Sequence, residues 1–271
     1  MPEIPDLEAI RGFLNQRLPG TRIEKAEALI PVVFRVSKEE FARVLEGNTF
    51  GETTRRGKFL LFGLESGDLL VINAMLTGRF QYVEAGLKRG ARTAMVLSLS
   101  NGRQLRYRDQ RVMGKIYVVP ADKLLTVPQF ADMGPDALEV SEEEFAQRIR
   151  KFTGMIKNIL VNLKFVAGIG NAYADEILFA AGIHPYRKRT ALKDEDISRL
   201  YQAMHTVFAW ATPIVAGQMR DELNYEERRE FLKVHRRGGD QCPVCGTRIS
   251  EITAGQRITS FCRNCQPGPN V

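Results

Sequence analysis

The spacing of hydrophobic positions divides the chain into a helical start, a β-rich part and a second helical part. Hydrophobic residues recur at helical spacing over residues 7–18, and a Pro-Gly pair ends the run, which predicts a short N-terminal helix. The period then changes to two. Residues 59–72 hold two apolar runs around a polar turn, and residues 95–107 alternate around an Asn-Gly pair, as is typical of β-hairpins.

The second half of the chain returns to the helical period. Ser141 and Glu144 form a capping box, the signal for a helix N-terminus. Helical spacing follows over residues 145–160, 173–182 and 197–208. The pattern therefore predicts an α+β protein. Its expected parts are a β-rich domain (1–120), a linker (121–139), a helical domain (140–235) and a small Cys-rich module (236–271).

Composition limits the classes of protein to which this chain can belong. With 271 residues, of which 44% are hydrophobic, the chain can bury a sizeable core, which argues against disorder. The net charge is +7 and the pI is about 9.3, so an anionic partner such as nucleic acid fits. No apolar run approaches the roughly 20 residues of a membrane helix, and the acidic, Pro-containing start is unlike a signal peptide. We expect a soluble, intracellular protein with no membrane partner.

All four cysteines lie in the C-terminal module, in two closely spaced pairs. Cys242-x-x-Cys245 is followed after sixteen residues by Cys262-x-x-Cys265, a spacing that arranges four thiolates tetrahedrally around zinc. Four sulfur ligands leave no open position for water, so we predict one structural Zn²⁺. Basic residues between the pairs, Arg257 among them, suit a zinc ribbon that presents Arg to phosphate. A ribbon used only for protein contacts is the alternative.

A glycine-containing turn, residues 167–173, connects two of the predicted helices. Its glycines allow a tight turn, and Asn171 is expected to cap the second helix, where exposed backbone N–H groups can meet a DNA phosphate. A third glycine and a preceding strand are missing, which excludes a dinucleotide-binding fingerprint. An ordinary helix–helix turn is the plainer alternative.

The N-terminus carries a second chemical signal. Removal of Met1 makes Pro2 a secondary amine, and an α-amino group that titrates near pH 8 keeps a useful neutral fraction. Such an amine can attack a carbonyl-like carbon and form an iminium. Glu3 and Asp6 lie beside it and are candidates for acid/base work. Taken alone, Pro2 is more often a simple N-terminal residue.

Basic residues gather on two of the predicted strands. Residues 55–58 read Arg-Arg-Gly-Lys and lead into a β-run, and residues 103–115 hold four Arg and one Lys. Such strands can line a groove that follows a phosphate backbone. A solvated strand face explains them equally well. His235 and Trp210 are interpreted as packing or surface residues.

Taken together, these features resemble the formamidopyrimidine-DNA glycosylase and endonuclease VIII family from residue 2 to the last Cys pair. The matching segments are MPEIPDLE, RRGKFLL, IKNILVNLKFVAGIGNAYADEILFAAGIHP and GQRITSFCRNCQ. The resemblance implies an N-terminal helix with a two-layered β-sandwich, a linker, a helix-two-turn-helix domain and a C-terminal zinc finger, with DNA in the cleft between. It also implies a bifunctional DNA glycosylase and abasic-site lyase of base excision repair.

The resemblance assigns roles by position. A damaged nucleotide in double-stranded DNA is flipped out of the duplex, because its C1′ is unreachable in the stack. Pro2 attacks C1′ and expels the base, Glu3 helps to open the sugar, and β- and δ-elimination cleave the strand from the Schiff base. Lys58 and Arg257 contact phosphates and assist, while Lys157 and Asn171 bind phosphates from the helical side.

Several positions depart from the family pattern. Asp6 replaces a Glu, so its contact to the sugar is expected to weaken, and Asn73 replaces a phosphate-contacting His. Purine-directed members fill the vacated stack with Met, Arg and Phe. The corresponding residues here are Leu76, preceded by Met75, then Arg111 and Met113. This wedge is closer to the endonuclease VIII branch.

The segment 217–234 replaces the longer Gly-rich loop that caps 8-oxoguanine in purine-directed members. We therefore expect activity on abasic sites and on formamidopyrimidines or oxidised pyrimidines, and poor cleavage of 8-oxoguanine, because lost polar contacts cost several powers of ten in rate. The rival hypothesis is a catalytically silent zinc-ribbon protein that binds nucleic acid on the same scaffold. A monomer in the cytoplasm, associated with the nucleoid in a bacterium, is expected.

Overall fold

Residues 1–131 and 212–227 form one structural unit, and residues 132–211 and 228–271 form a second, in a computed structural model. The structure describes residues 1–219, 223–224, 226–254 and 257–268. Most of the helical part and the Cys-rich module belong to the same unit, whereas the end of the long helix α6 (Asp194–Gly217) and the chain that follows it, up to residue 227, belong to the first unit.

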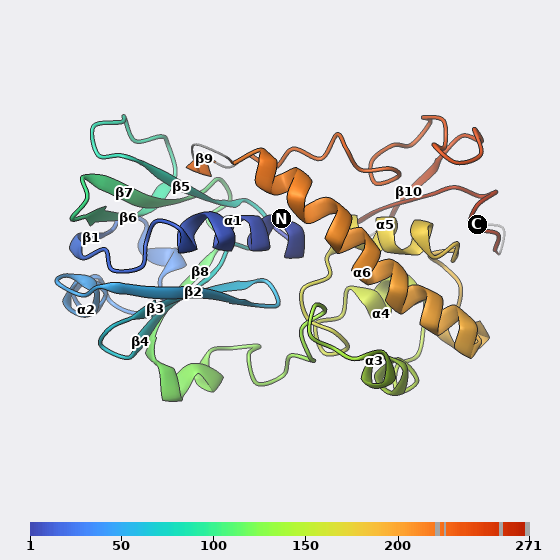
Figure 1. The fold of residues 1–271 in the computed structure, drawn as a ribbon, viewed down its shortest axis with the longest axis horizontal. Coiled ribbons are helices and arrows are strands. Elements are labelled where there is room, and N and C mark those ends of the chain that lie inside the picture. The colour runs from blue at the N-terminus through green and yellow to red at the C-terminus, as the bar shows by residue number, and fades with distance from the viewer. Residues whose placement is uncertain (220–222, 225, 255–256, 269–271) are drawn as a thin grey trace. The chain divides into compact units, whose positions relative to one another are not determined.

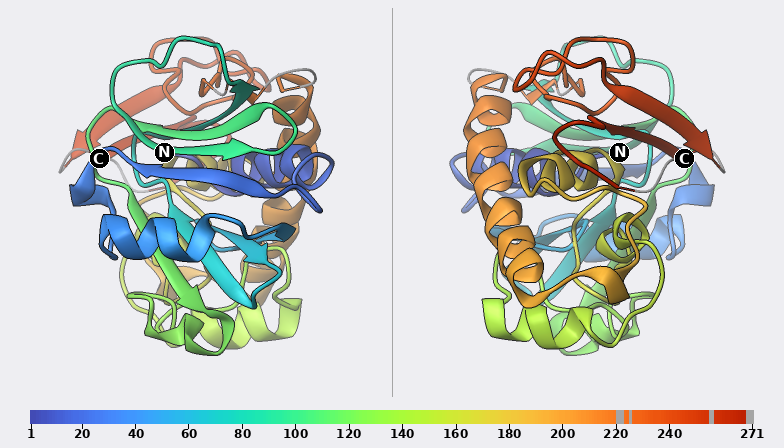
Figure 2. Two further views of the ribbon diagram at one scale, coloured as in Figure 1. Left: turned by 90° about the vertical axis from the view of Figure 1, so that its left-hand side faces the viewer. Right: turned by 90° about the vertical axis from the view of Figure 1, so that its right-hand side faces the viewer.

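Two antiparallel sheets make up most of the first unit (Figure 1, Figure 2). The first sheet has the order β2 (Phe50–Arg56), β3 (Phe59–Leu64), β4 (Asp68–Asn73), β8 (Lys115–Pro120). The second has the order β1 (Ile23–Ala28), β6 (Thr93–Leu99), β7 (Arg103–Asp109), β5 (Gly78–Glu84), β9 (Leu223–Asn224). Phe62 of β3 packs on Phe80 of β5, with ring centroids 6.1 Å apart. The sheets are the two layers of a sandwich, which confirms the predicted architecture.

Helix α1 (Ile4–Asn15) packs against both sheets and buries most of its apolar side chains there. The Asn15 side chain pairs with β2: it donates to the Thr53 carbonyl at 2.8 Å and accepts from the Thr53 N–H at 2.7 Å. Phe13 meets Tyr82 of β5 edge to face, with centroids 6.1 Å apart. The helix ends three residues before Leu18, which is nevertheless fully buried. The short helices η1 (Pro31–Val33) and α2 (Lys38–Leu45) lie within the part that was predicted to be β-rich.

The predicted linker is not a bare connection. Its start forms the 3-10 helix η2 (Ala121–Thr126), and Phe130 packs on Phe59 of β3 with centroids 5.2 Å apart. Burial of an aromatic side chain contributes roughly 1.5–3 kcal/mol to the free energy of folding. Residues 121–131 accordingly belong to the same unit as the two sheets.

The second unit is mainly helical. Its elements are α3 (Glu142–Ile149), α4 (Ile156–Leu160), α5 (Asn171–Ala180), η3 (Arg189–Ala191), the first part of α6 (Asp194–Gly217), β10 (Ser250–Ala254) and β11 (Arg257–Phe261). Ser141 caps α3 by accepting from the Glu144 N–H at 3.1 Å, as predicted. The single helical run expected over 145–160 is wrong, because Gly154, at φ +107, lies between α3 and α4. No helix among the described residues is long and apolar enough to span a membrane.

Candidate functional site

The first turn of α1 holds the residues that the sequence singled out at the N-terminus. Pro2 is buried, and Glu3 and Asp6 are only 2% and 1% exposed. Glu3 is the N-cap of α1, and the Asp6 carboxylate accepts a 2.7 Å hydrogen bond from the Glu3 N–H, which completes a capping box. The box fixes the backbone of Glu3 next to Pro2.

Met1 precedes this turn and is held by a carboxylate far along the chain. Its ammonium group lies 3.0 and 3.1 Å from the two carboxylate oxygens of Glu227. Arg79 of β5 donates to the same carboxylate at 2.7 Å. Sequence reasoning missed Glu227, and the only signal was its place in the segment that departs from the family pattern.

Lys58 lies in the turn between β2 and β3. Gly57 adopts φ +57, a left-handed conformation that glycine reaches without strain. Arg55 donates to the Gly57 carbonyl at 2.9 Å and to Glu8 of α1 at 2.6 Å, so it ties this turn to the helix that carries Pro2. Asn73 pairs with Phe59 across β3 and β4, which puts it beside Lys58 at the same end of the sheet.

The predicted wedge residues lie on two crossovers between the sheets. Residues 74–77 lead from β4 to β5, and residues 110–114 lead from β7 to β8. Leu76 and Met113 are each 39% exposed, and Arg111 is exposed as well. The structure thus brings these three residues to one end of the sandwich.

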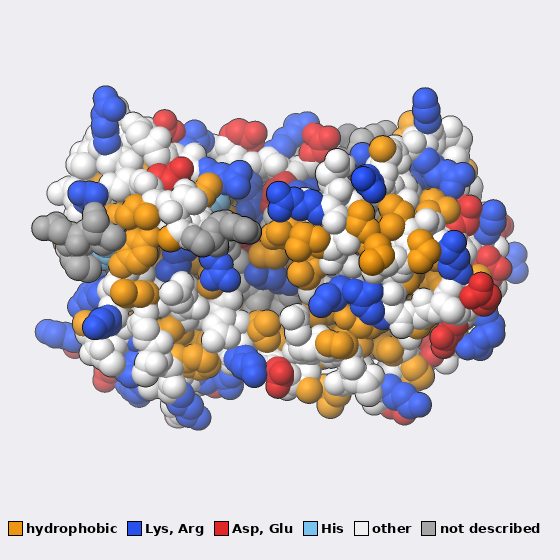
Figure 3. Space-filling view, turned by 180° about the vertical axis from the view of Figure 1, so that it is seen from behind, with side chains coloured by type: hydrophobic (Ala, Val, Ile, Leu, Met, Phe, Trp, Pro, Cys, Tyr) orange, Lys and Arg blue, Asp and Glu red, His pale blue; other side chains and the backbone are white. Residues whose placement is uncertain are grey.

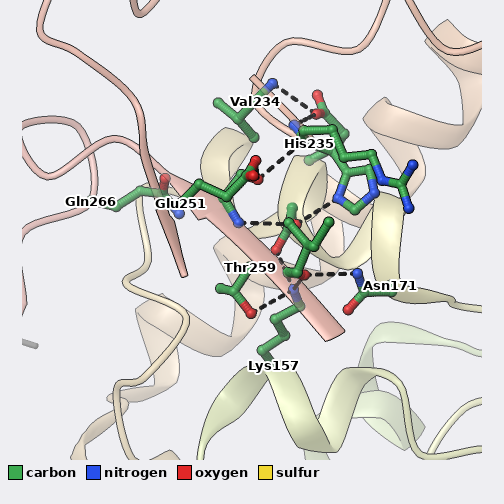
Figure 4. A network of polar contacts seen from close by, with 12 residues as sticks. Lys157, Asn171, Val234, His235, Glu251, Thr259 and Gln266 are labelled. Carbon is green, nitrogen blue, oxygen red and sulfur yellow. Dashed lines mark hydrogen bonds and ion pairs between the residues drawn. The ribbon is translucent and has the colours of Figure 1, made fainter. Parts of the chain in front are cut away.

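Lys157 and Asn171 belong to the second unit and are held by the Cys-rich module (Figure 4). The Lys157 ammonium lies 2.6 Å from Asp175 and donates to the Ile258 carbonyl at 2.8 Å, and it is 6% exposed. Asn171 donates to the same Ile258 carbonyl at 2.8 Å. The prediction that Asn171 caps α5 is wrong: Gly170 is the N-cap, because the amide of Asn171 turns toward β11.

Two adjacent carboxylates of α5 complete this buried network. Asp175 accepts from the Ser260 N–H at 3.2 Å and lies 2.7 Å from His235 Nδ1. Glu176 accepts from the backbone N–H groups of residues 233–235 at 2.9–3.0 Å. Burial raises the pKa of Glu176, although these three N–H groups act in the opposite direction. His235, interpreted from the sequence as a packing or surface residue, is part of the polar network instead.

The four cysteines form one cluster. Their sulfur atoms lie within 4.8 Å of one another, with Cys242–Cys265 at 3.8 Å and Cys245–Cys262 at 3.4 Å. A tetrahedral site with Zn–S bonds of about 2.3 Å has sulfur atoms about 3.8 Å apart, so the cluster fits one Zn²⁺. Hydrogen bonds from Thr247 lower the pKa of the Cys245 thiol to about 5, whereas burial raises the pKa of the Cys262 and Cys265 thiols, so the case for zinc rests on the geometry of the four sulfur atoms.

The metal cluster is joined to the helices by apolar contacts. Cys242 and Cys262 are buried together with Phe179 of α5, Val234 and Ile249. Arg257 is exposed and is the first residue of β11, directly before Ile258. The zinc site, Lys157 and Asn171 therefore all fix the strand that begins with Arg257.

Three family models match the chain in sequential order. The formamidopyrimidine-DNA glycosylase N-terminal domain matches residues 1–116, the formamidopyrimidine-DNA glycosylase H2TH domain matches residues 133–222, and the zinc finger found in FPG and IleRS matches residues 239–268. The chain therefore belongs to the formamidopyrimidine-DNA glycosylase family.

Individual relatives match over nearly the whole length. A formamidopyrimidine-DNA glycosylase of Desulfitobacterium hafniense is 37% identical over 273 residues, which cover 98% of this chain and 100% of that protein. One of Symbiobacterium thermophilum is 36% identical over 276 residues, with 99% and 90% covered. The solved structure of Lactococcus lactis Fpg with DNA that contains an abasic site has a TM-score of 0.90 at 28% identity and covers 98% of this chain and 100% of that one.

The family defines the enzyme class. The chain is a bifunctional DNA glycosylase and abasic-site lyase of DNA repair, with one structural zinc held by its four cysteines. These comparisons confirm the family, the fold and the class of enzyme that the sequence predicted.

Proposed function

We propose that the enzyme excises damaged bases from double-stranded DNA with the amine of Pro2, after Met1 has been removed. The observation that carries this proposal is the buried first turn of α1, where Pro2 adjoins Glu3 and the capping box fixes the backbone between them. A fixed nucleophile next to a carboxyl group is the arrangement that covalent catalysis with proton transfer requires.

The reaction begins once the damaged nucleotide has left the stack. The Pro2 nitrogen forms a bond to C1′, the glycosidic C1′–N bond breaks, and the base leaves with a proton. Glu3 gives a proton to O4′ as the C1′–O4′ bond breaks, which leaves an iminium between Pro2 and the opened sugar. Loss of a C2′ proton then expels the 3′ phosphate, δ-elimination expels the 5′ phosphate, and water releases Pro2 from the sugar remnant.

Phosphate contacts hold the DNA during these steps. We assign them to Lys58 and Asn73 in the sandwich unit and to Asn171 and Arg257 in the helical unit. The positions of two cations support this assignment most directly: Lys58 lies in the turn just before β3, and Arg257 is the first residue of β11. Lys157 is paired with buried Asp175, so it acts on DNA chiefly by holding β11 in place. The enzyme acts as a monomer.

The preferred lesions are formamidopyrimidines and oxidised pyrimidines rather than 8-oxoguanine. The support is the family resemblance of the sequence, in which the segment 217–234 stands in place of the Gly-rich loop of purine-directed members. Residues 220–222 and 225 of this segment lie outside the described residues. A side-by-side excision assay on duplexes that carry one lesion each tests the preference, and 8-oxoguanine as the best substrate would contradict it.

Borohydride trapping on duplex DNA with one abasic site tests the Pro2 mechanism. We expect one covalent adduct per chain, mapped by mass spectrometry to Pro2, and no adduct from Pro2→Gly or from a chain that retains Met1. Both altered chains should still bind the duplex, because phosphate contacts do not require the amine. A processed wild-type chain that binds DNA but gives no adduct would favour the silent nucleic-acid-binding protein.

A further inference from the structure

The two crossovers that carry Leu76, Arg111 and Met113 lie side by side because of strand register. Asn73, at the end of β4, pairs with Lys115 at the start of β8. Gly78, at the start of β5, pairs with Asp109 at the end of β7. Both crossovers therefore leave one sheet and enter the other at the same end of the sandwich.

A single buried carboxylate binds both crossovers. Asp109 is completely buried, and its Oδ1 accepts from the Thr77 hydroxyl at 2.5 Å and from the Arg111 N–H at 3.2 Å. Its Oδ2 accepts from the Gly114 N–H at 2.6 Å. The Thr77 hydroxyl in turn accepts from the Arg111 N–H at 3.0 Å, so the two crossovers share one hydrogen-bonded centre.

Each crossover also contains a strained backbone position. Met75 has φ 48 and Val112 has φ 56, conformations that residues with a side chain rarely adopt. Such positions persist only where the surroundings hold them. Here the hydroxyl of buried Tyr107 lies so close to Gly78 and Gly114 that a methyl group at either glycine would overlap it. Asp109 and Tyr107 thus leave the crossovers little freedom to move.

We propose that Asp109 is the positioning residue of the DNA wedge: it holds both crossovers as one rigid support, so that Leu76, Arg111 and Met113 enter the duplex together. The inference rests on the proposed function, in which these three side chains fill the space of the flipped nucleotide. A preorganised wedge loses little conformational freedom on insertion, and this lowers the free energy needed to unstack the duplex.

Two substitutions remove the shared centre with little change of shape. Thr77→Val deletes the bridging hydroxyl, Thr77→Ser keeps it, and Asp109→Asn removes the charge. Asp68→Asn, a half-exposed Asp at the opposite end of β4, makes the same chemical change away from the crossovers and is the matched control. Thermal unfolding of every variant checks that each one is folded at the assay temperature.

The first readout is single-turnover cleavage at an abasic site placed in a duplex and in the same strand alone. Loss of a hydrogen bond to a charged group changes an equilibrium constant by about tenfold or more. We therefore expect the ratio of the duplex cleavage rate to the single-strand cleavage rate to fall about tenfold for Thr77→Val and Asp109→Asn. Thr77→Ser and Asp68→Asn should keep the wild-type ratio.

The second readout does not depend on lyase chemistry. A duplex with an uncleavable tetrahydrofuran abasic site next to 2-aminopurine gains fluorescence when the wedge unstacks it, and this gain should shrink for Thr77→Val and Asp109→Asn alone. An equal loss of both cleavage rates, or an unchanged fluorescence gain, would overturn the role of Asp109. Failure of the wild-type chain to form an adduct on duplex abasic DNA that it binds would instead contradict the Pro2 mechanism.

Discussion

At the scale of single residues, Asp6 shows how a departure from a family pattern is compensated locally. The sequence suggested a weaker contact to the sugar because Asp is one methylene shorter than Glu. In the structure its carboxylate reaches the Glu3 N–H at 2.7 Å, one of the backbone donors that a helix start leaves without a partner inside the helix. The shorter side chain suits this contact, so Asp6 acts on the site through the position of Glu3.

Removal of the Asp6 side chain tests this role. We expect Asp6→Ala to lower the free energy of unfolding by about 1 kcal/mol, the usual value of a helix cap, and to slow strand cleavage because the Glu3 backbone is released. Urea unfolding and cleavage of an abasic duplex measure the two effects. Ser37→Ala removes the cap of α2, where the Ser37 hydroxyl accepts from Glu40, and should cost similar stability without slowing cleavage. Equal stability of Asp6→Ala and wild type would refute the cap.

At the scale of elements, the hairpin β10–β11 holds together the side of the second unit that we propose binds phosphates. Its Ile258 carbonyl accepts from both Lys157 and Asn171, and its Ser260 N–H binds Asp175. The hairpin itself is placed by the zinc cluster through Cys242 and Cys262. Loss of the metal is therefore expected to displace Arg257 and to break the contacts that β11 makes with α4 and α5.

Chelation of zinc should abolish specific DNA binding and lower the thermal stability of the second unit. Structural zinc sites contribute folding free energy directly, because the ligands are brought together only in the folded state. Gel-shift titrations of metal-loaded and metal-free protein at one salt concentration, with zinc release followed by a colorimetric chelator, measure this. Re-addition of zinc is the control for irreversible damage, and undiminished binding by the metal-free protein would exclude the proposed role.

Sequence patterns predicted those elements whose signals are local. The helix over residues 7–18, the hairpin over residues 59–72 and the Cys pairs each depend on neighbours a few residues away. Asp109 and Glu227 could not be found in this way. The partners of Asp109 are brought to it by strand register, and the partners of Glu227 lie 148 and 226 positions away in the sequence. The side-chain amide of Asn171 likewise bonds to the Ile258 carbonyl instead of capping its helix, and no local sequence pattern predicts such a tertiary contact.

At the scale of the whole molecule, the positive net charge favours binding to DNA of any sequence. The net charge is +7, and Lys and Arg are the commoner charged side chains on the face drawn in Figure 3. The cations proposed to reach DNA are Lys58, Arg111 and Arg257, whereas Lys157 is already paired with Asp175. Binding should therefore release few counterions, fewer than the number of basic residues suggests.

The salt dependence of binding measures this number. Two neutralised phosphates, at Lys58 and Arg257, predict a loss of roughly 12-fold in affinity between 50 and 200 mM salt, and Arg257→Met should reduce the slope of log affinity against log salt by about 0.9. Arg43→Met changes an exposed cation of α2 with no proposed DNA contact and should leave the slope unchanged. Fluorescence anisotropy on an abasic duplex provides the slopes, and a flat dependence would contradict the phosphate contacts.

The ion pair between the first residue and Glu227 links maturation to the order of synthesis. A ribosome that adds 5–20 residues per second needs roughly 10–45 s to travel from the first codon to the codon of Glu227. During that time an aminopeptidase meets the emerging amino end before its carboxylate partner exists. In a chain folded with Met1 intact, that residue is only 24% exposed and its ammonium is held at 3.0 Å. The proposed Pro2 mechanism therefore requires that Met1 be removed before this ion pair forms, and we expect the removal to occur during translation, within about the first minute of synthesis.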